Sequence, residues 1–182
     1  MATSKADKKK ADKKIMAKVL PFATRHDLSD ATRTKVVASL NQTLAETFDL
    51  QSQVKQAHWN VKGPSFFGLH KLFDEIAESL TKPIDTVAER ILSLGGFAKG
   101  TVRMAASASA LPDLPAEFRQ EDIVGDLADR VALAAKLARK RIDTSEDAGD
   151  KVTSDLFIEV VACLDKALYF LEAYQFRGQN TQ

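Results

Sequence analysis

Apolar side chains recur every three or four positions along most of the chain, and this pattern predicts long amphipathic helices. Residues three and four apart share one side of a helix, so the spacing gives each helix a face that another helix can cover. Four segments have this spacing, at about residues 29–61, 65–94, 121–144 and 151–176. No segment has the alternation of apolar and polar positions that is typical of strands. The sequence therefore predicts an all-α fold, a four-helix bundle.

Glycine and proline mark the breaks between these helices, with one such pair at residues 63–64 and two glycines at 95–96. Residues 97–120 are rich in small side chains and proline, and a short helix is predicted within them at 101–109. This middle connection is long enough to cross the bundle, whereas the short breaks on either side make antiparallel neighbours. Pro83 lies inside the second helix and should kink it, because proline lacks the backbone N–H.

Lysine is concentrated at the start of the chain. Residues 1–18 contain few large apolar side chains and carry a net charge of +5, whereas the remaining residues carry −4. Seven lysines supply the positive charge: Lys5, Lys8, Lys9, Lys10, Lys13, Lys14 and Lys18. This composition is typical of a solvated arm. We therefore expect a flexible arm and connector over residues 1–26, the bundle over 27–178 and a short tail over 179–182.

The composition also bears on the compartment. A single cysteine, Cys163, excludes an intrachain disulfide and fits a reducing environment. No apolar run approaches the roughly 20 residues that a membrane span requires, and no apolar stretch follows the first lysines as in a signal peptide. We therefore expect a cytoplasmic protein that does not associate with membranes.

Residue types that bind metals gather at helical spacing in the first two predicted helices. His58 is followed by the pair His70 and Asp74, and then by the pair Asp85 and Glu89. Residues four apart project from the same side of a helix, so each pair can present two donor groups to one ion. Imidazole and carboxylate ligands together suit iron, zinc or manganese better than calcium or magnesium. These residues are candidate metal ligands, although a solvated helix face has the same residue types.

The two pairs cannot share one ion within a chain. Asp74 and Asp85 are eleven residues apart, which is roughly 16 Å of helix, whereas metal–ligand bonds are about 2 Å long. Either there are two incomplete sites, or a second copy packs antiparallel and completes each one, as two-fold symmetry allows. The Glu-x-x-His spacing of single-chain di-iron bundles is absent, since Lys55 and Phe67 precede the two histidines by three residues. A metal site here therefore requires two subunits.

Two blocks of sequence carry a resemblance to a known family. Residues 55–66 read KQAHWNVKGPSF, and residues 85–96 read DTVAERILSLGG. With His70 and Asp74 between them, they are similar to the Dps family, the DNA-binding proteins from starved cells or mini-ferritins. The similarity extends over about residues 30–176. It implies a ferritin-like four-helix bundle with a long middle crossover carrying a short extra helix, and a hollow dodecamer of such subunits.

The resemblance also implies an activity. Members of the family are ferroxidases that oxidise ferrous iron, preferably with hydrogen peroxide, between two-fold related subunits. They store the ferric mineral inside the shell and protect DNA from oxidative damage. Carried over by position, the catalytic and metal-binding residues are His58, His70 and Asp74 of one subunit with Asp85 and Glu89 of its mate. A two-iron site is then possible, with zinc as a competitor.

Several other residues have two interpretations. Trp59 lies beside the iron if the resemblance holds, and otherwise packs as an aromatic against a neighbouring helix. A group of acids near the third break forms either a solvated turn or, by resemblance, the lining of a three-fold pore that attracts ferrous ions. They are Asp143, Glu146, Asp147, Asp150 and Asp155. We expect Cys163, Tyr169 and Tyr174 to be packing residues.

Two other functions remain open. The lysine arm, from Lys5 to Lys18, can bind DNA phosphates without reading sequence, and many arms on one shell would add avidity. The protein would then be mainly a non-specific DNA-binding, nucleoid-compacting protein with minor iron chemistry. Alternatively, the arm aids solubility or docks on a neighbouring subunit. A more distant alternative is a helical scaffold whose histidines bind zinc structurally.

Overall fold

The computed structural model describes residues 19–176, so the lysine arm and the predicted tail lie outside the described residues. Six helices occur in this range: α2 (Asp30–Asn60), α3 (Phe66–Ser79), α4 (Thr81–Ser93), α5 (Val102–Ala108), α6 (Ile123–Asp147) and α7 (Lys151–Gln175). No strand is present between residues 19 and 176, which confirms the all-α prediction. None of these helices is both long enough and apolar enough to cross a membrane.

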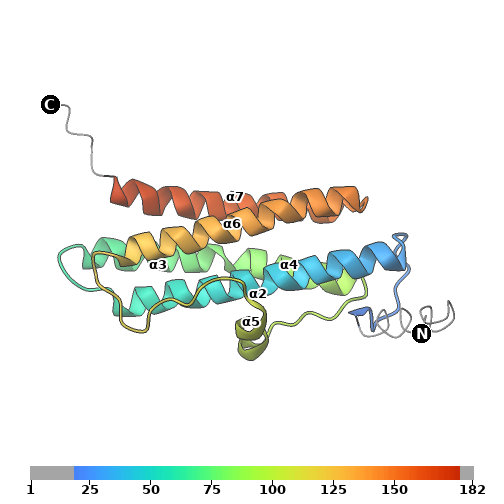
Figure 1. Cartoon of the computed structure of the whole chain (residues 1–182), viewed down its shortest axis with the longest axis horizontal. Coiled ribbons are helices and arrows are strands. Elements are labelled where there is room, and N and C mark those ends of the chain that lie inside the picture. The colour runs from blue at the N-terminus through green and yellow to red at the C-terminus, as the bar shows by residue number, and fades with distance from the viewer. Residues whose placement is uncertain (1–18, 177–182) are drawn as a thin grey trace, which may run out of the picture.

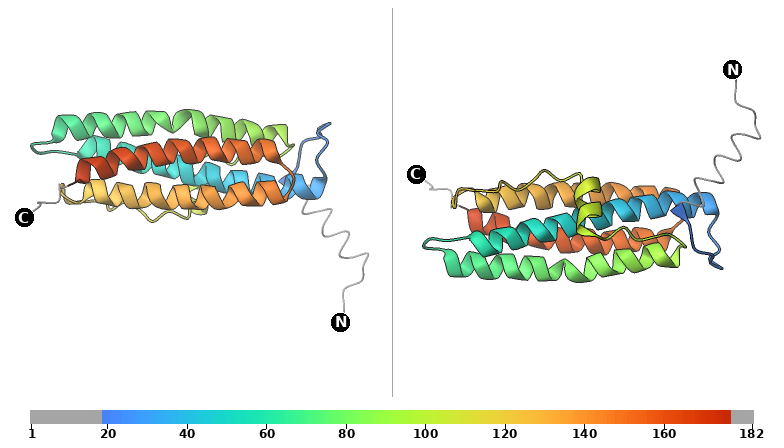
Figure 2. Two further views of the ribbon diagram at one scale, coloured as in Figure 1. Left: turned by 90° about the horizontal axis from the view of Figure 1, so that it is seen from above. Right: turned by 90° about the horizontal axis from the view of Figure 1, so that it is seen from below.

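The helices form a bundle of four parallel rods, in which α3 and α4 together make one rod (Figures 1 and 2). α6 and α7 pack closely as an antiparallel pair, while α2 contacts α3, α4, α5 and α6. The middle connection crosses the bundle and carries α5 against α2. Side chains of α2 hold this crossover: Asn41 donates to the Phe97 carbonyl (3.1 Å) and Gln42 to the Ala108 carbonyl (2.7 Å). The predicted short helix and crossover are therefore confirmed.

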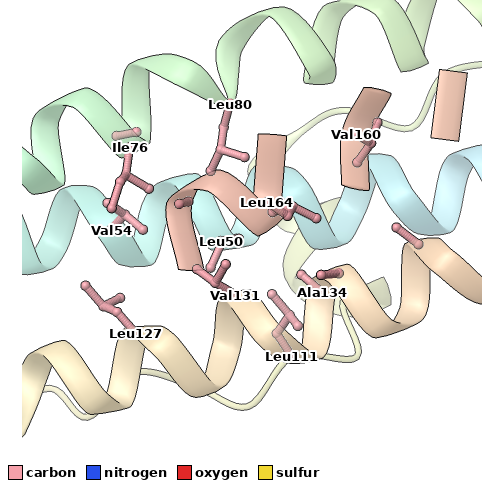
Figure 3. Close-up of a cluster of buried hydrophobic side chains, with 14 of the residues drawn as sticks. Leu50, Val54, Ile76, Leu80, Leu111, Leu127, Val131, Ala134, Val160 and Leu164 are labelled. Atoms are coloured by element: carbon pink, nitrogen blue, oxygen red, sulfur yellow. The ribbon is translucent and has the colours of Figure 1, made fainter. Parts of the chain in front are cut away.

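The core lies along the axis of the bundle, where the predicted apolar faces meet. Figure 3 shows part of it, formed by side chains from all four rods. Those labelled include Leu50, Val54, Ile76, Leu80, Leu127, Val131, Val160 and Leu164. Burying each large side chain contributes about 1.5–3 kcal/mol. Tyr169 and Tyr174, in contrast, are exposed on this subunit and take no part in its core.

The second predicted helix is divided in two. α3 ends at Ser79 and α4 begins at Thr81, with Leu80 as a turn between them. Pro83 has no N–H, so the Ser79 carbonyl four residues earlier receives no helical hydrogen bond. The helical bonds resume at once, because the Ile84 N–H donates to the Leu80 carbonyl (3.1 Å). The helix is thus interrupted near Pro83, where the sequence predicted a kink, and the break falls three residues before the proline.

The connector before α2 packs on the end of the bundle where α4 ends. The Phe22 N–H donates to the Gly95 carbonyl (3.1 Å), and Val19 and Leu20 pack partly against the core. Gly95 has a φ of +80°, and a Cβ there would lie 2.6 Å from the Phe22 carbonyl oxygen. Glycine is therefore required at this turn. Ser29 then caps α2, since its hydroxyl accepts from the Thr32 N–H (3.1 Å).

Candidate metal centre

Two histidine rings stack where α2 and α3 meet. The His58 and His70 ring centroids are 3.8 Å apart, and the ring planes differ by 20°. The His58 Nδ1 lies 2.8 Å from the His70 carbonyl oxygen, and the His70 Nδ1 lies 2.9 Å from the His58 carbonyl oxygen. A carbonyl can only accept, so each Nδ1 carries the hydrogen. In a neutral ring the Nε2 then keeps its lone pair, which is the form that binds metals.

Local structure brings these two rings together. His58 lies in the last turn of α2, and His70 lies one turn into α3. The connection between the helices is short, because Gly63 adopts a φ of +94° that allows a tight reversal. The Phe66 ring then packs with its centroid 5.0 Å from that of His70. The rings are thus held by packing on one side and by backbone carbonyls at their Nδ1 atoms.

Asp74 lies one turn beyond His70 and is paired with a lysine from α2. Its Oδ1 accepts from the Lys55 Nζ at 2.7 Å and lies 3.9 Å from the His58 Nε2. The hydrogen bond from Lys55 is the main reason that the pKa of Asp74 lies below its ordinary value. The carboxylate is therefore ionised next to the two imidazoles, and an ammonium group occupies one of its oxygens.

Asp85 and Glu89 lie on α4, away from the histidines. Both are exposed, and neither makes a side-chain hydrogen bond or an ion pair with another residue of the range 19–176. In this part of the chain, no three histidine, cysteine or acidic side chains are arranged to hold a metal ion. The structure thus brings together His58, His70 and Asp74 but not the other two candidates. One subunit provides two separate groups of candidate ligands.

A groove of two adjacent hollows runs from Asp74 to Asp85 along the surface between α2 and the α3–α4 rod. One hollow of about 430 Å³ is lined by Lys55 and Asp74, and a second of about 840 Å³ is lined by Asp85. Both are bordered by Gln51, Glu78 and Thr81, so they are neighbours. The larger hollow has an apolar lining on its other sides, formed by Leu44, Phe48, Ile84, Ala88 and Ala98. The apolar lining of the larger hollow is suited to a protein partner.

Trp59 has no packing role within the subunit, since 69% of it is exposed beside His58. Packing of Trp59 against a helix would therefore take place between subunits.

One acid of the α6–α7 turn is not solvated. Asp150 is buried and caps α7, accepting from the Thr153 N–H (3.0 Å) and from the Arg90 Nη2 (2.8 Å). Burial alone would raise the pKa of Asp150, but the Thr153 hydrogen bonds and the Arg90 charge outweigh it and leave the pKa below its ordinary value. The sequence signal was the N-cap spacing of Asp150 and Thr153, whereas nothing in the sequence indicated Arg90 as the partner.

Comparisons of the sequence and of the structure with known proteins point to the same family. The ferritin-like domain matches residues 37–177. A "DNA protection during starvation protein" of Agrobacterium fabrum is 40% identical over 152 residues, which cover 83% of this chain and 94% of that protein. The Dps structure of Mycobacterium smegmatis is 31% identical with a TM-score of 0.81, and the match covers 88% of this chain and 96% of that one. DpsC from Streptomyces coelicolor is 27% identical with a TM-score of 0.83 over 91% of this chain and 96% of that one. The chain therefore belongs to the ferritin-like family and, within it, to the Dps proteins.

Proposed function

We propose that this protein is a ferroxidase and iron-storage protein that uses hydrogen peroxide as the preferred oxidant and protects DNA from oxidative damage. The reciprocal hydrogen bonds of His58 and His70 carry the proposal, because they engage both Nδ1 atoms and leave both Nε2 atoms for a metal. The His58 Nε2 lies 3.9 Å from the Asp74 carboxylate. Neutral imidazole and carboxylate are suitable donors for ferrous iron, and zinc would compete for the same set. Ferrous iron is the substrate of the proposed site. We place the protein in the cytoplasm.

The second half of the site comes from another copy of the chain. Asp85 and Glu89 are exposed without partners in residues 19–176, and Asp85 lines the hollow next to the one that Asp74 lines. A two-fold axis across the groove would bring the same surface of both subunits together in opposite directions. Asp85 and Glu89 of each subunit would then face His58, His70 and Asp74 of the other. The apolar lining of the groove supports a second copy as the occupant, and such dimers are units of the proposed dodecamer.

A site that binds two ferrous ions can reduce hydrogen peroxide in a single two-electron step. Two ferrous ions give one electron each to one peroxide, which takes up two protons and becomes two waters. Delivering both electrons together avoids the hydroxyl radical that a single-electron reduction would release. The Nδ1-to-carbonyl hydrogen bonds of His58 and His70 select the neutral tautomer in which Nε2 carries the lone pair, and this is the atom that would bind ferrous ions. The exposed Trp59 is placed to intercept a stray one-electron oxidant.

The lysine arm supports non-specific DNA binding as a second function. Residues 1–18 carry a net charge of +5, although they lie outside the described residues. Phosphate contacts of this kind give affinity without sequence preference. The name of the Agrobacterium relative, which refers to DNA protection, is compatible with both functions.

For the chain as a whole we propose a three-part organisation, with an arm and connector over 1–26, a bundle over 27–178 and a tail over 179–182.

The site can be tested by anomalous scattering from crystals soaked in ferrous salt. We expect a peak at a two-fold interface, within bonding distance of His58 and His70 of one subunit and of Asp85 and Glu89 of its mate. Crystals of the His70→Ala protein, soaked in the same way, are the matched control and should lose the peak. Iron bound elsewhere, or bound equally by the variant, would contradict the proposed site.

A further inference from the structure

The break between α3 and α4 leaves one backbone carbonyl without its helical donor. Ser79 is the last residue of α3, and the residue four positions later is Pro83. Because proline has no N–H, the Ser79 carbonyl cannot be satisfied within the helix. An unsatisfied carbonyl weakens the helix at that point and makes it a site of bending. The rod formed by α3 and α4 therefore lacks a helical hydrogen bond at its break, where Gln51 of α2 already contacts Ala77 and Thr81.

A side chain of α7 supplies a donor at this point. The Cys163 Sγ lies 3.5 Å from the Ser79 carbonyl oxygen and 3.6 Å from the Ser79 Oγ. The thiol is a weak donor, but among residues 19–176 no other side chain donates to that carbonyl. Hollows of about 220 and 120 Å³ flank the contact, and both are lined by Ser79 and Cys163. The thiol therefore bridges a sparsely packed part of the α3–α7 interface.

The same helix also holds α4 beyond the break. The Arg90 Nε donates to the Thr153 Oγ1 (2.9 Å), and its Nη2 donates to Asp150 (2.8 Å). Thr153 belongs to the first turn of α7, and Asp150 is its N-cap. This contact is well buried, since the Asp150 side chain is 1% exposed and that of Arg90 13%. One uninterrupted helix thus makes directed contacts on both sides of the break.

We propose that α7 acts as a splint across the proline break, with Cys163 and Arg90 as positioning residues for the metal centre. Asp74 lies before Leu80 and Asp85 lies after it, so bending at Leu80 changes the distance between the two ligand groups. In a two-fold dimer each site takes one group from either side of a break, which makes its geometry sensitive to this angle. The inference rests on the proposed function, because the splint positions ligands of that site.

The hydrogen bond can be tested by substitutions in the full-length assembly. Cys163→Val replaces the thiol with a somewhat larger apolar side chain that has no donor, and the flanking hollows leave room for it, whereas Cys163→Ser keeps a donor. We expect the valine variant to speed amide hydrogen exchange at residues 81–86 by roughly two- to tenfold, the range that one net hydrogen bond corresponds to, while serine restores protection. Pro83→Ala returns the missing N–H, so the valine substitution should then change exchange less than about twofold. If Cys163→Val speeds amide exchange equally in the wild-type and Pro83→Ala proteins, the splint is wrong.

The positioning role is tested by titration with cobalt(II), whose absorption spectrum reports its ligands. We expect Cys163→Val and Thr153→Val each to weaken cobalt binding by roughly two- to tenfold, with recovery in Cys163→Ser and Thr153→Ser. Glu159→Gln, which lines the hollow beside Cys163, should have no effect. If His70→Ala abolishes cobalt binding but both valine variants bind normally, the positioning role is wrong and the proposed site stands. If His70→Ala binds cobalt like the wild type, the proposed site itself fails.

Discussion

His58 and His70 each hold the ring of the other through its backbone. The two Nδ1-to-carbonyl distances are 2.8 and 2.9 Å, and the rings between them are stacked at 3.8 Å. Each histidine is therefore a candidate ligand and also the group that orients the other ligand. Such orienting partners usually raise metal affinity 10- to 100-fold. Removing either ring should consequently weaken metal binding by the other ring as well.

We predict that His70→Ala lowers cobalt(II) affinity by at least about 100-fold, because it removes a ligand and also the ring that stacks on His58. His58→Ala should have an effect of similar size. His26→Ala is the matched control, since this histidine lies in the connector and its Nδ1 accepts from the Leu28 N–H (3.3 Å). Calorimetric titration of the three variants measures the affinities. If each single variant loses no more affinity than the removal of one independent ligand would cause, mutual orientation is wrong.

We predict complementation between subunits. His70→Ala and Glu89→Ala shells should each lose most peroxide-driven ferrous oxidation while remaining assembled. In a mixed dimer one site combines both substitutions and the other is wholly wild type, so equal random mixing should restore about a quarter of the activity. Mixing His58→Ala with His70→Ala is the control and should restore nothing, because both substitutions lie in the same half of the site. Full mixing without recovery would mean that the ligands come from one chain.

The helices could be predicted from the sequence because burial repeats with the helical period. α2 and α7 begin and end within a residue or two of the prediction. α6 begins at Ile123, two residues later than expected. Asp122 is its N-cap and makes no side-chain capping bond, so the polar residues before it gave no sharp signal. The interruption near Pro83 could be predicted because its cause, the missing N–H, is local.

The contacts that adjust the site could not be predicted. Lys55 pairs with Asp74, Arg90 with Asp150, and Cys163 with Ser79. Each pair joins different helices, and whether the side chains meet depends on how the helices rotate and slide against one another. Sequence spacing could place His70 and Asp74 on one face, because they share a helix. It could not indicate that a lysine from α2 would occupy that carboxylate.

The Lys55–Asp74 pair leads to a third prediction. Metal binding must displace the ammonium from Asp74, so Lys55→Met should bind cobalt(II) more tightly at neutral pH, by roughly two- to fivefold for a solvent-screened pair. Loss of Lys55 also lets the pKa of Asp74 rise towards its ordinary value of 3.8. Protons should then compete with the metal at higher pH in the variant than in the wild type. Cobalt titrations at several pH values measure this, with Lys62→Met as the control. If affinity depends on pH in the same way in Lys55→Met and in the wild type, the idea is refuted.

The buried Arg90–Asp150 pair should matter for stability. Asp150→Asn keeps the size and N-capping ability of the side chain but leaves Arg90 without its counter-charge, which should cost about 3 kcal/mol. The exposed Asp147→Asn on the same turn should change stability by less than about 0.5 kcal/mol. Guanidinium unfolding at a fixed protein concentration measures both variants. Comparable stabilities would mean that the pair contributes little beyond packing.

The same pair predicts a pH dependence. The pKa of Asp150 is lower in the folded protein than its ordinary value of 3.8. Its contribution to stability is therefore fully present above the unfolded pKa and is lost as the pH falls through the folded one. The difference in unfolding free energy between the wild type and Asp150→Asn should be constant near neutrality and shrink only below about pH 4. A difference that shrinks already at pH 6 would point to another titrating group.

The lysine arm separates the two proposed functions. Deleting residues 1–18 removes a net charge of +5 per chain and leaves −4 on the remainder, which should repel DNA. We predict that the truncated protein no longer retards DNA in gels, while its ferroxidase rate is unchanged because every candidate ligand lies on α2, α3 or α4. A second variant keeps the full length but replaces the seven lysines with glutamine, and it should behave like the deletion if charge is the cause.

Salt then distinguishes phosphate binding from other modes. The affinity of the intact protein should fall steeply as salt rises and should not depend on DNA sequence, because release of counterions drives binding. Each lysine that contacts a phosphate adds about 0.9 to the slope of log affinity against log salt. Asp7 and Asp12 should keep the slope per arm below the value for all seven lysines. If the glutamine variant binds DNA as tightly as the intact protein and with the same slope, the DNA contacts lie on the bundle and not on the arm.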